Sequence, residues 1–338
     1  MSRVVCFGEV LLRLSAPTNE LLLQSARLNV CVGGAEANVA VSLAKFGHDA
    51  ATVSILPDNP LGRAARDELR RHGVDTRSLR FVEGRMGLYF LSPGAVVRPS
   101  EVTYDRAGSA FALASEDAID WEKELDGAEW FHVSGVTPAV GPSAANAVVK
   151  AVQTARKLGV PVSFDGNYRA KMWAAWNGDG PAVLRQILDC ADLAFVNDRD
   201  IALILGESFL DESAQVRRRK AAERAFEVFP NLKRMTSTVR LTPSADHHEL
   251  SAVMISRDGG EHITRAFPLA GVVDRIGGGD AFAAGVLHGL LTGLNDADAV
   301  EFGLAAGALK HAVFGDFNLV SASDVQALLD GEGLDVKR

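Results

Sequence analysis

The segment Asp274–Phe282 holds the residues best suited to chemistry. Three consecutive glycines are followed by one carboxylate, Asp280, at the start of an apolar run with helical character, Ala281–Leu291. Glycines let the backbone turn sharply and bring its N–H groups close to a ligand. A helix N-terminus adds unpaired donors and partial positive charge, so this turn is suited to holding an anion such as a phosphate.

Asp280 has two interpretations. Beside a bound phosphate, its carboxylate could take a proton from an attacking hydroxyl. Alternatively, Asp280 caps the helix, as aspartates often do. Taken alone, this segment favours the cap. The rest of the chain reverses that preference and makes Asp280 the predicted catalytic residue.

A second glycine pair, Gly33 and Gly34, also opens a helical run. Paired glycines permit a ligand to approach the backbone closely, and Asn38 offers both a donor and an acceptor to sugar hydroxyls. The alternative is a tight turn with Asn38 in the first helical turn, and the motif alone favours it. No Gly-x-x-x-x-Gly-Lys-Ser/Thr sequence occurs, so any use of ATP does not involve a Walker-type loop.

Two further groups could bind a substrate. Arg169 follows a strand-like run and could clamp a carboxylate or phosphate bidentately; the alternative is a surface arginine in a strand-end turn. Tyr89, Tyr104, Asp105 and Arg106 could close over a small polar substrate and exclude water. Alternatively they form cross-strand pairs, which these residues alone favour.

The elements that position these residues alternate between strands and helices, which predicts a mainly parallel sheet covered by helices on both faces. The strand-like runs are Val4–Gly8, Ala51–Ile55, Trp130–Ser134, Val160–Phe164, Leu193–Asn197 and Leu232–Thr236. The helical runs are Ala35–Phe46, Leu61–His72, Ser143–Leu158, Ala182–Cys190 and Gln215–Phe229, then Ala281–Leu291, Ala297–Phe314 and Ser323–Leu329. Ligands bind such sheets at the carboxyl ends of the strands, where Asp165, Asn197 and the glycine turn fall.

Two stretches, residues 11–32 and 87–106, lack helical period and alternate between apolar and polar residues. They predict antiparallel strands that form a small β lid over one end of the sheet. The prediction is one domain, residues 1–338, that carries this lid. An exposed apolar face of the lid could pair with a second copy of the chain.

Composition narrows the partners. The formal net charge of −8 over 338 residues makes general nucleic-acid binding a poor fit, and no apolar run is long enough to span a membrane. Three widely spaced cysteines suit reduced thiols in the cytoplasm better than disulfides or a zinc site. The predicted partners are therefore small molecules.

Together, the two glycine motifs resemble the signatures of the PfkB (ribokinase-like) carbohydrate kinases. The first runs from Gly33 to Gly47 and the second from Asp274 to Asp280, in the family's order. The resemblance covers almost the whole chain. It implies a three-layer α/β sandwich with a β lid, ATP-dependent phosphorylation of a sugar hydroxyl, and Mg²⁺ carried with the nucleotide.

Within this family, the chain is most similar to the 2-keto-3-deoxygluconate kinases. The similar segments are Gly8–Leu14, Arg98–Ser100, Tyr104–Arg106, Asp165–Arg169, Asp274–Ile276 and Gly315–Asn318. Fructokinase-like relatives commonly carry an aspartate in the place of Arg13, which weakens a fructose alternative. A kinase for another sugar and a non-catalytic sugar-binding regulator remain the alternatives.

The resemblance implies a role for each matching residue, and the glycine turn with Asp280 would perform the transfer. Substrate-binding residues would be Gly33, Gly34, Ala35, Glu36, Ala37, Asn38, Tyr89, Tyr104, Asp105, Arg106, Arg169 and Asp316. The anion hole and ATP site would comprise Gly277, Gly278, Gly279, Asn167, Arg169, Asn197, Thr238 and Arg240. Asp200 stands where the family usually has a glutamate that helps to place Mg²⁺, and it is one methylene shorter.

Overall fold

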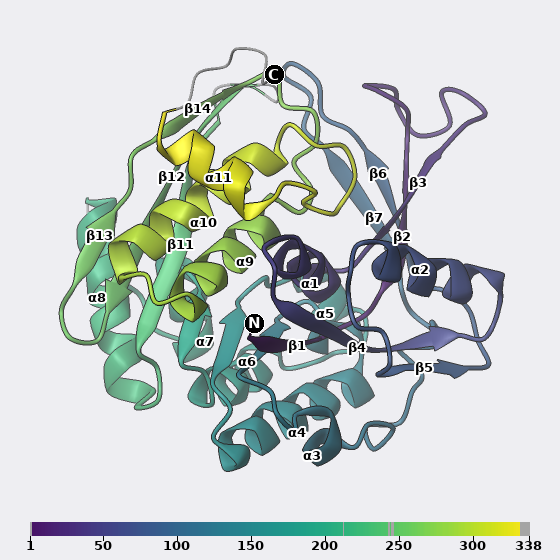
Figure 1. Ribbon diagram of the computed structural model, residues 1–338, viewed down its shortest axis with the longest axis horizontal. Helices are drawn as coiled ribbons and strands as arrows, with labels where there is room; N and C mark the ends of the chain where they lie inside the picture. The colour runs from purple at the N-terminus through teal and green to yellow at the C-terminus, as the bar shows by residue number, and fades with distance from the viewer. Residues whose placement is uncertain (1, 212, 243, 245–246, 332–338) are drawn as a thin grey trace.

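A mainly parallel sheet forms the centre of the protein (Figure 1). The computed structural model describes residues 2–211, 213–242, 244 and 247–331, and within these residues the sheet has ten strands. Their order is β13-β12-β11-β10-β9-β8-β1-β4-β5, with β14 paired to β12. The bounds are β1 (Arg3–Phe7), β4 (Asp49–Pro57), β5 (Leu79–Val82), β8 (Trp130–Ser134), β9 (Val162–Asp165), β10 (Leu193–Phe195), β11 (Arg234–Leu241), β12 (His247–Ser256), β13 (Glu261–Ile263) and β14 (Phe267–Ala270).

The strands from β11 to β5 pair in parallel, whereas β12, β13 and β14 pair antiparallel. Val4, Val5 and Cys6 of β1 have no exposed surface. Such apolar runs are typical of strands covered on both faces. The predicted α/β class with a mainly parallel sheet is confirmed. The predicted domain spans residues 1–338, of which residues 332–338 lie outside the described part.

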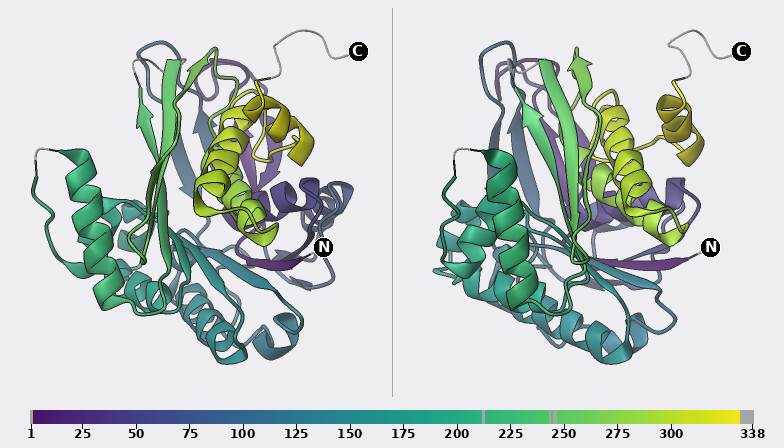
Figure 2. Two further views of the ribbon diagram at one scale, coloured as in Figure 1. Left: turned by 60° about the vertical axis from the view of Figure 1, so that its left-hand side comes forward. Right: turned by 90° about the vertical axis from the view of Figure 1, so that its left-hand side faces the viewer.

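Helices cover both faces of the sheet, as Figure 2 shows, and each layer has its own apolar core. One face packs against α1 (Ala35–Lys45), α2 (Pro60–Arg71), α9 (Gly278–Leu291), α10 (Asp296–Lys310) and α11 (Ala322–Leu329). The other packs against α3 (Trp121–Glu124), α4 (Pro142–Leu158), α5 (Ala170–Ala174), α6 (Gly180–Asp189), α7 (Asp198–Leu205) and α8 (Ala214–Val228).

Two elements near the carboxyl edge differ from the prediction. Strand β11 continues five residues beyond the predicted end at Thr236, because it pairs with β12 from Arg234↔Ser256 to Leu241↔Glu249. Thr238 and Arg240 therefore belong to a strand rather than a turn. Helix α7 was not predicted, and it begins with Asn197 as its N-cap.

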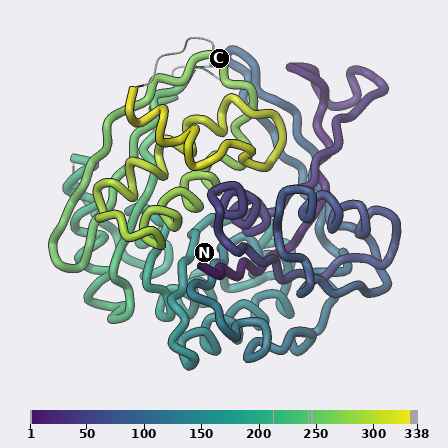
Figure 3. The backbone as a smooth tube through the Cα atoms, viewed as in Figure 1, coloured from purple at the N-terminus to yellow at the C-terminus, as the bar shows by residue number. Residues whose placement is uncertain are grey.

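A second sheet forms the lid from β2 (Leu11–Ser15), β3 (Asn29–Gly33), β6 (Leu88–Ser92) and β7 (Glu101–Asp105). Each hairpin is antiparallel, as predicted, but β2 and β6 pair in parallel. Figure 3 follows the chain from the large sheet into the lid, back again, and into the lid a second time. The predicted pairing of two lids stays a prediction.

The lid lies over the edge of the large sheet where β8, β9 and β10 end. Leu11, Tyr89 and Leu91 form its buried inner face and pack against Ile276, which precedes α9. The lid therefore contacts the glycine turn directly. Among the helices of the described residues, none has the length and apolar character needed to cross a membrane.

Candidate active site

A cavity of about 430 Å³ lies between the lid and the carboxyl edge of the large sheet. Its walls come from the lid, the end of β9, and the N-termini of α1 and α9. The lining includes Leu11, Gly34, Ala35, Asn38, Tyr89, Tyr104, Arg106, Asp165, Asn167, Arg169, Arg240, Arg275, Gly277, Gly279, Asp280 and Asp316. Residues from both glycine motifs and the lid, far apart in the sequence, thus share one cavity.

Both helices at the cavity begin with a glycine N-cap that no other residue could replace without strain. Gly34 has φ 145° and Gly277 has φ 81°. A Cβ at Gly34 would clash with the Glu9 carbonyl oxygen, and one at Gly277 with that of Asp316. The first amides of a helix lack intrahelical partners, so both N-termini offer donors at the cavity.

Asp280 does not cap its helix. Within the described residues, no side chain caps α9; instead Nδ2 of Asn38 donates to Oδ2 of Asp280 at 2.6 Å. Burial raises the pKa of Asp280 to about 7, the Asn38 hydrogen bond opposes that shift, and the charges of Glu36 and Asp316 add to it. A carboxyl group with a pKa near neutrality is suited to accept a proton from a substrate hydroxyl.

Asp316 is held by groups from the lid. The Tyr89 hydroxyl donates to Oδ2 of Asp316 at 2.7 Å, and Nε of Arg13 lies 3.1 Å from Oδ1. Burial raises the pKa of Asp316, and the Arg13 guanidinium opposes the rise. Arg13 also pairs with Asp274 at 2.7 Å. The sequence marked Arg13 only as a departure from fructokinases, and its role in orienting Asp316 was missed.

Three arginines around the cavity have no carboxylate partner within the described residues: Arg169, Arg240 and Arg275. Arg169 donates to the Tyr168 carbonyl at 3.2 Å, and Arg240 lies 3.2 Å from a nitrogen of His311. Burial, then repulsion from Arg275, lowers the pKa of Arg240 to about 10, so it stays charged at neutral pH. These guanidinium groups can therefore receive anions.

Arg275 was not assigned a role from the sequence, although it adjoins the glycines. Arg106 differs from the three unpaired arginines, because its Nε donates to Glu9 at 2.5 Å.

A smaller cavity of about 280 Å³ adjoins the first. Asn167, Asn197, Asp200, Ser237, Thr238 and Gly279 are among the residues that line it, and Asp165, Asn167, Arg169 and Gly279 line both cavities. Its amides and hydroxyls are uncharged donors suited to phosphate oxygens. Of the predicted ATP-site residues, Asn167, Arg169, Asn197, Thr238 and Gly279 line this smaller cavity, whereas Gly277 and Arg240 line only the first one.

The side chain of Asp200 helps to stabilise the start of α7. Its Oδ2 accepts the backbone N–H of Asn197 at 2.9 Å, and the Asn197 side chain accepts the Asp200 N–H in return, which forms a capping box. The pKa of Asp200 is raised, mainly by burial. Within the described residues, no three acidic, histidine or cysteine side chains gather closely enough to hold a metal.

Asp165, the last residue of β9, is a carboxylate whose role the sequence did not assign. It lines both cavities, and burial followed by repulsion from Asp280 raises its pKa to about 8, against the opposing charge of Arg169. Its only sequence signal was its place at a strand end. Asp165 and Asp280, two carboxyl groups with pKa values near neutrality, thus interact with Arg169, an arginine that lines both cavities.

Some predicted site residues have side chains that lie elsewhere. Glu36 and Ala37 are buried behind the cavity wall, where Glu36 accepts the N–H of Ser134 at 3.0 Å. Asp105 points to the outer face of the lid and pairs with Arg85 at 2.7 Å. Helical phase and strand alternation turned these side chains away.

Two predicted glycines also lie outside the linings. Gly33 and Gly278 leave space for the side chains of Asp316 and His311 respectively.

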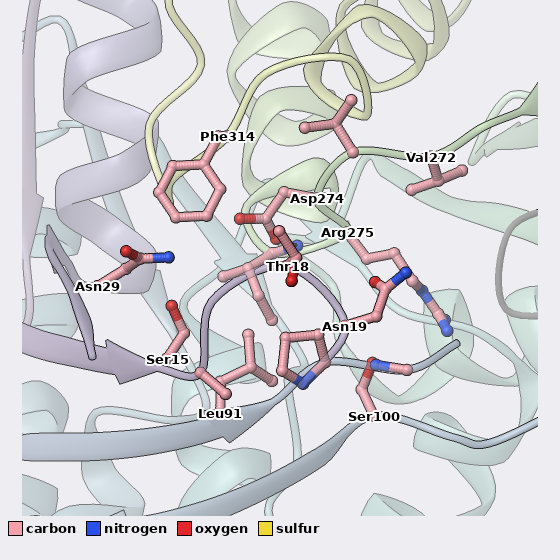
Figure 4. A pocket seen from close by; sticks show the side chains of 15 residues that line it. Ser15, Thr18, Asn19, Asn29, Leu91, Ser100, Val272, Asp274, Arg275 and Phe314 are labelled. Carbon is pink, nitrogen blue, oxygen red and sulfur yellow. Dashed lines mark hydrogen bonds between the residues drawn. The ribbon is translucent and has the colours of Figure 1, made fainter. Parts of the chain in front are cut away.

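A third cavity, of about 460 Å³, is lined in part by the segment that leads into the glycine turn (Figure 4). Ser15 and Asn29 come from the lid strands, whereas Asp274 and Arg275 come from the turn segment. Arg275 lines this cavity and the first one. The lid and the glycine turn thus meet on two sides.

Comparison with known proteins agrees with this geometry. The profile of the pfkB family of carbohydrate kinases matches residues 1–320. The chain belongs to this family. The predicted family membership is therefore confirmed.

Three carbohydrate kinases resemble this chain over nine-tenths or more of their own length. This chain is 33% identical over 338 residues to a 2-dehydro-3-deoxygalactonokinase of Haloferax volcanii, and the alignment covers 100% of this chain and 99% of the relative. The crystal structure of a 2-dehydro-3-deoxygluconokinase of Thermotoga maritima superimposes with a TM-score of 0.90 at 39% identity, over 98% of this chain and 100% of that one. A 2-dehydro-3-deoxygluconokinase of Bacillus subtilis is 28% identical over 93% of this chain and 91% of its own.

Proposed function

We propose that the protein phosphorylates the terminal hydroxyl of a 2-keto-3-deoxy sugar acid with ATP, most simply 2-keto-3-deoxygluconate to its 6-phosphate. The observation that carries this proposal is Asp280. Its partly buried carboxyl group has a pKa near neutrality and lies in the first turn of a helix whose N-terminus faces the same cavity. The names of the similar kinases support a sugar acid as the substrate.

The first cavity suits a polyhydroxylated acid. Asp316, held by Tyr89 and Arg13, presents a fixed acceptor to sugar hydroxyls, and Asn38 presents an amide. Arg169 has no carboxylate partner within the described residues, so it is free to bind the substrate's acid group bidentately. We assign the sugar acid to this cavity and the nucleotide to the smaller one.

The donor set of the smaller cavity fits a nucleotide that carries Mg²⁺. The amides and hydroxyls of Asn197, Ser237 and Thr238 suit phosphate oxygens, whereas Asp165 and Asp200, once ionised, would repel a bare triphosphate. When bound, the ion would neutralise charge on the phosphate oxygens. Asp165 and Asp200 are the carboxylates that would face it.

In the proposed reaction, Asp280 accepts the proton of the sugar hydroxyl while that oxygen attacks the γ-phosphate in line. The amides at the start of α9 stabilise the negative charge that develops on the transferred group. The lid, through Tyr104, excludes water from the reacting atoms.

The three cysteines are unpaired, in keeping with our expectation that the reaction takes place in the cytoplasm.

The test measures ADP release with 2-keto-3-deoxygluconate, its galactonate-derived epimer, fructose and a deoxy-sugar analogue that lacks the acid group. We expect turnover with a keto-deoxy acid and a clear loss without the acid. Equal turnover of the neutral analogue would assign Arg169 another role and favour a neutral sugar. Binding of a sugar without ADP release would favour the non-catalytic regulator.

A further inference from the structure

A buried lysine lies beneath the glycine turn. Lys310, the last residue of α10, has 0% exposure and is among the largest fully buried side chains of the described residues. Its ammonium group donates to the Val313 carbonyl at 2.8 Å. A Cβ added to Gly277 would lie 3.3 Å from the Cε of Lys310. The end of the lysine side chain therefore lies directly against the underside of the turn.

Three other buried charges lie close to this ammonium group. Asp274, Asp316 and Arg13 are 8%, 3% and 0% exposed, and Arg13 pairs with both carboxylates. Asp274 also accepts the backbone N–H groups of Ile276 and Gly315, each at 3.0 Å. These contacts fix the residues that flank the glycine turn.

The two cations balance the two carboxylates of this cluster. Burial is the largest influence on Lys310 and lowers its pKa, whereas Asp274, Asp316 and Asp280 raise it. Arg13 contacts both Asp274 and Asp316, whereas no carboxylate of the described residues pairs with Lys310 within 4.0 Å, so Lys310 balances the remaining negative charge from a greater distance. The field of the ammonium group is therefore not cancelled by a contacting anion.

A buried ammonium group is costly to the fold. Removing such an ion from water is strongly unfavourable, and a protein with a neutral side chain of similar volume in its place is often as stable or more stable. Stability alone thus gives little reason for a lysine here rather than a methionine. A positive charge beneath the turn would, however, act when negative charge develops above it during phosphoryl transfer.

We propose that Lys310 is a positioning residue for phosphoryl transfer, whose fixed ammonium group raises the positive potential at the amides of the glycine turn and supports the turn from below. This inference rests on the proposed kinase function. The competing explanation is a cap, because cations stabilise helix C-termini and Lys310 bonds a carbonyl just past α10. A cap contributes to stability, whereas the proposed role contributes to turnover.

The experiment compares Lys310→Met with the parent and with Lys45→Met. Lys45 is the last residue of α1, so the control removes a lysine from a second helix C-terminus away from the turn. We expect kcat of Lys310→Met to fall about 10–100-fold, less than the roughly 10²–10³-fold found when a direct donor to a developing oxyanion is lost, with KM for the sugar unchanged. We expect its Tm to equal or exceed that of the parent.

Chemical rescue adds a readout that a purely structural role would not change. Lys310→Ala leaves a cavity in place of the side chain, so added ethylammonium should restore part of kcat, whereas tetramethylammonium at equal ionic strength should not. Parent-like kcat in folded Lys310→Met would overturn the proposal. Unfolding of both variants without recovery in ethylammonium would overturn it too, because the charge would then determine the fold.

A failure of the proposed function gives a different pattern. If the parent releases no ADP with any sugar, the kinase assignment fails, and Lys310 is then tested by calorimetric titration with a non-hydrolysable ATP analogue. Affinity for this anion should fall about tenfold in Lys310→Met and stay at the parent value in Lys45→Met. Equal affinities in all three proteins would overturn the inference about Lys310.

Discussion

Helices α1 and α9 begin alike at the same cavity but use their first acidic residue differently. Each has a glycine N-cap with positive φ and one carboxylate in its first turn, Glu36 or Asp280. Glu36 turns into the protein, where the N–H and hydroxyl of Ser134 donate to it at 3.0 and 2.9 Å. Asp280 faces the cavity and accepts a hydrogen bond from Asn38.

A shift of one residue along the helix is enough to separate a structural carboxylate from a candidate catalytic one. Glu36 is the second residue of its helix and Asp280 the third, and one residue rotates a side chain by about 100°. Burial raises the pKa of both groups. Of these two groups, only Asp280 combines the raised pKa with access to a ligand, so Asp280 rather than Glu36 can exchange a proton with a substrate.

The sharpest test of this comparison replaces each carboxylate. Asp280→Asn should lower kcat by roughly 10²–10⁴-fold, because a general base is lost, and should leave the protein folded. Glu36→Ala should instead lower the free energy of unfolding by roughly 1–3 kcal/mol, because the buried Ser134 N–H loses its acceptor. Steady-state kinetics and denaturant titration of both variants measure the two effects. Near-parent kcat in folded Asp280→Asn would refute the assignment of the base.

A smaller effect is expected when the N-cap glycines are changed. Gly277→Ala should lower kcat about 10–100-fold, because the Cβ meets the Asp316 carbonyl and displaces the amides of the turn. Gly34→Ala should mainly raise KM for the sugar, because α1 contributes binding groups rather than the base.

Gly293→Ala is the matched control for these glycines. Gly293 lies just past the other end of α9, at φ 84° with no atom within 4 Å of an added Cβ, so its substitution reports left-handed strain alone. A kcat loss in Gly293→Ala equal to that of Gly277→Ala would show that strain, not the position of the turn, explains the effect.

The smallest effect is a shift in pH dependence. Asp280 must be deprotonated to act as a base, so kcat/KM should rise with pH through a midpoint near its pKa of about 7. Glu36→Gln removes a charge that raises the pKa of Asp280 and should move the midpoint to lower pH. Asn38→Ala removes the hydrogen bond that lowers this pKa and should move it to higher pH. Identical profiles in all three proteins would mean that another group titrates.

Much of the fold could be predicted because it depends on local patterns. Buried parallel strands carry uninterrupted apolar runs, and the helices that cover them carry a 3.6-residue apolar period, so the alternation was visible residue by residue. Helix α7 was not predicted, and the extension of β11 was not predicted because pairing with β12, not propensity, sets its length.

The site could be predicted only where a backbone requirement is encoded locally. Gly34 and Gly277 lie in the two glycine motifs that predict turns, and both have positive φ; Asp280 follows the second of these turns. Arg13 and Asp274 are 261 positions apart, so no local signal could pair them. The sequence does not distinguish Lys310 from a surface lysine at a helix end. Lys310 is buried because α10 packs beside α9.

By itself, the order of residues determined which segments turn, which become strands or helices, and that one carboxylate would start a helix behind three glycines. These are short-range properties of φ preference and apolar period. Tertiary structure alone decided which side chains reach the cavity, which arginines stay unpaired, and that a lysine supports the turn. Those outcomes depend on helical phase and on contacts between distant segments, which exist only after the layers pack.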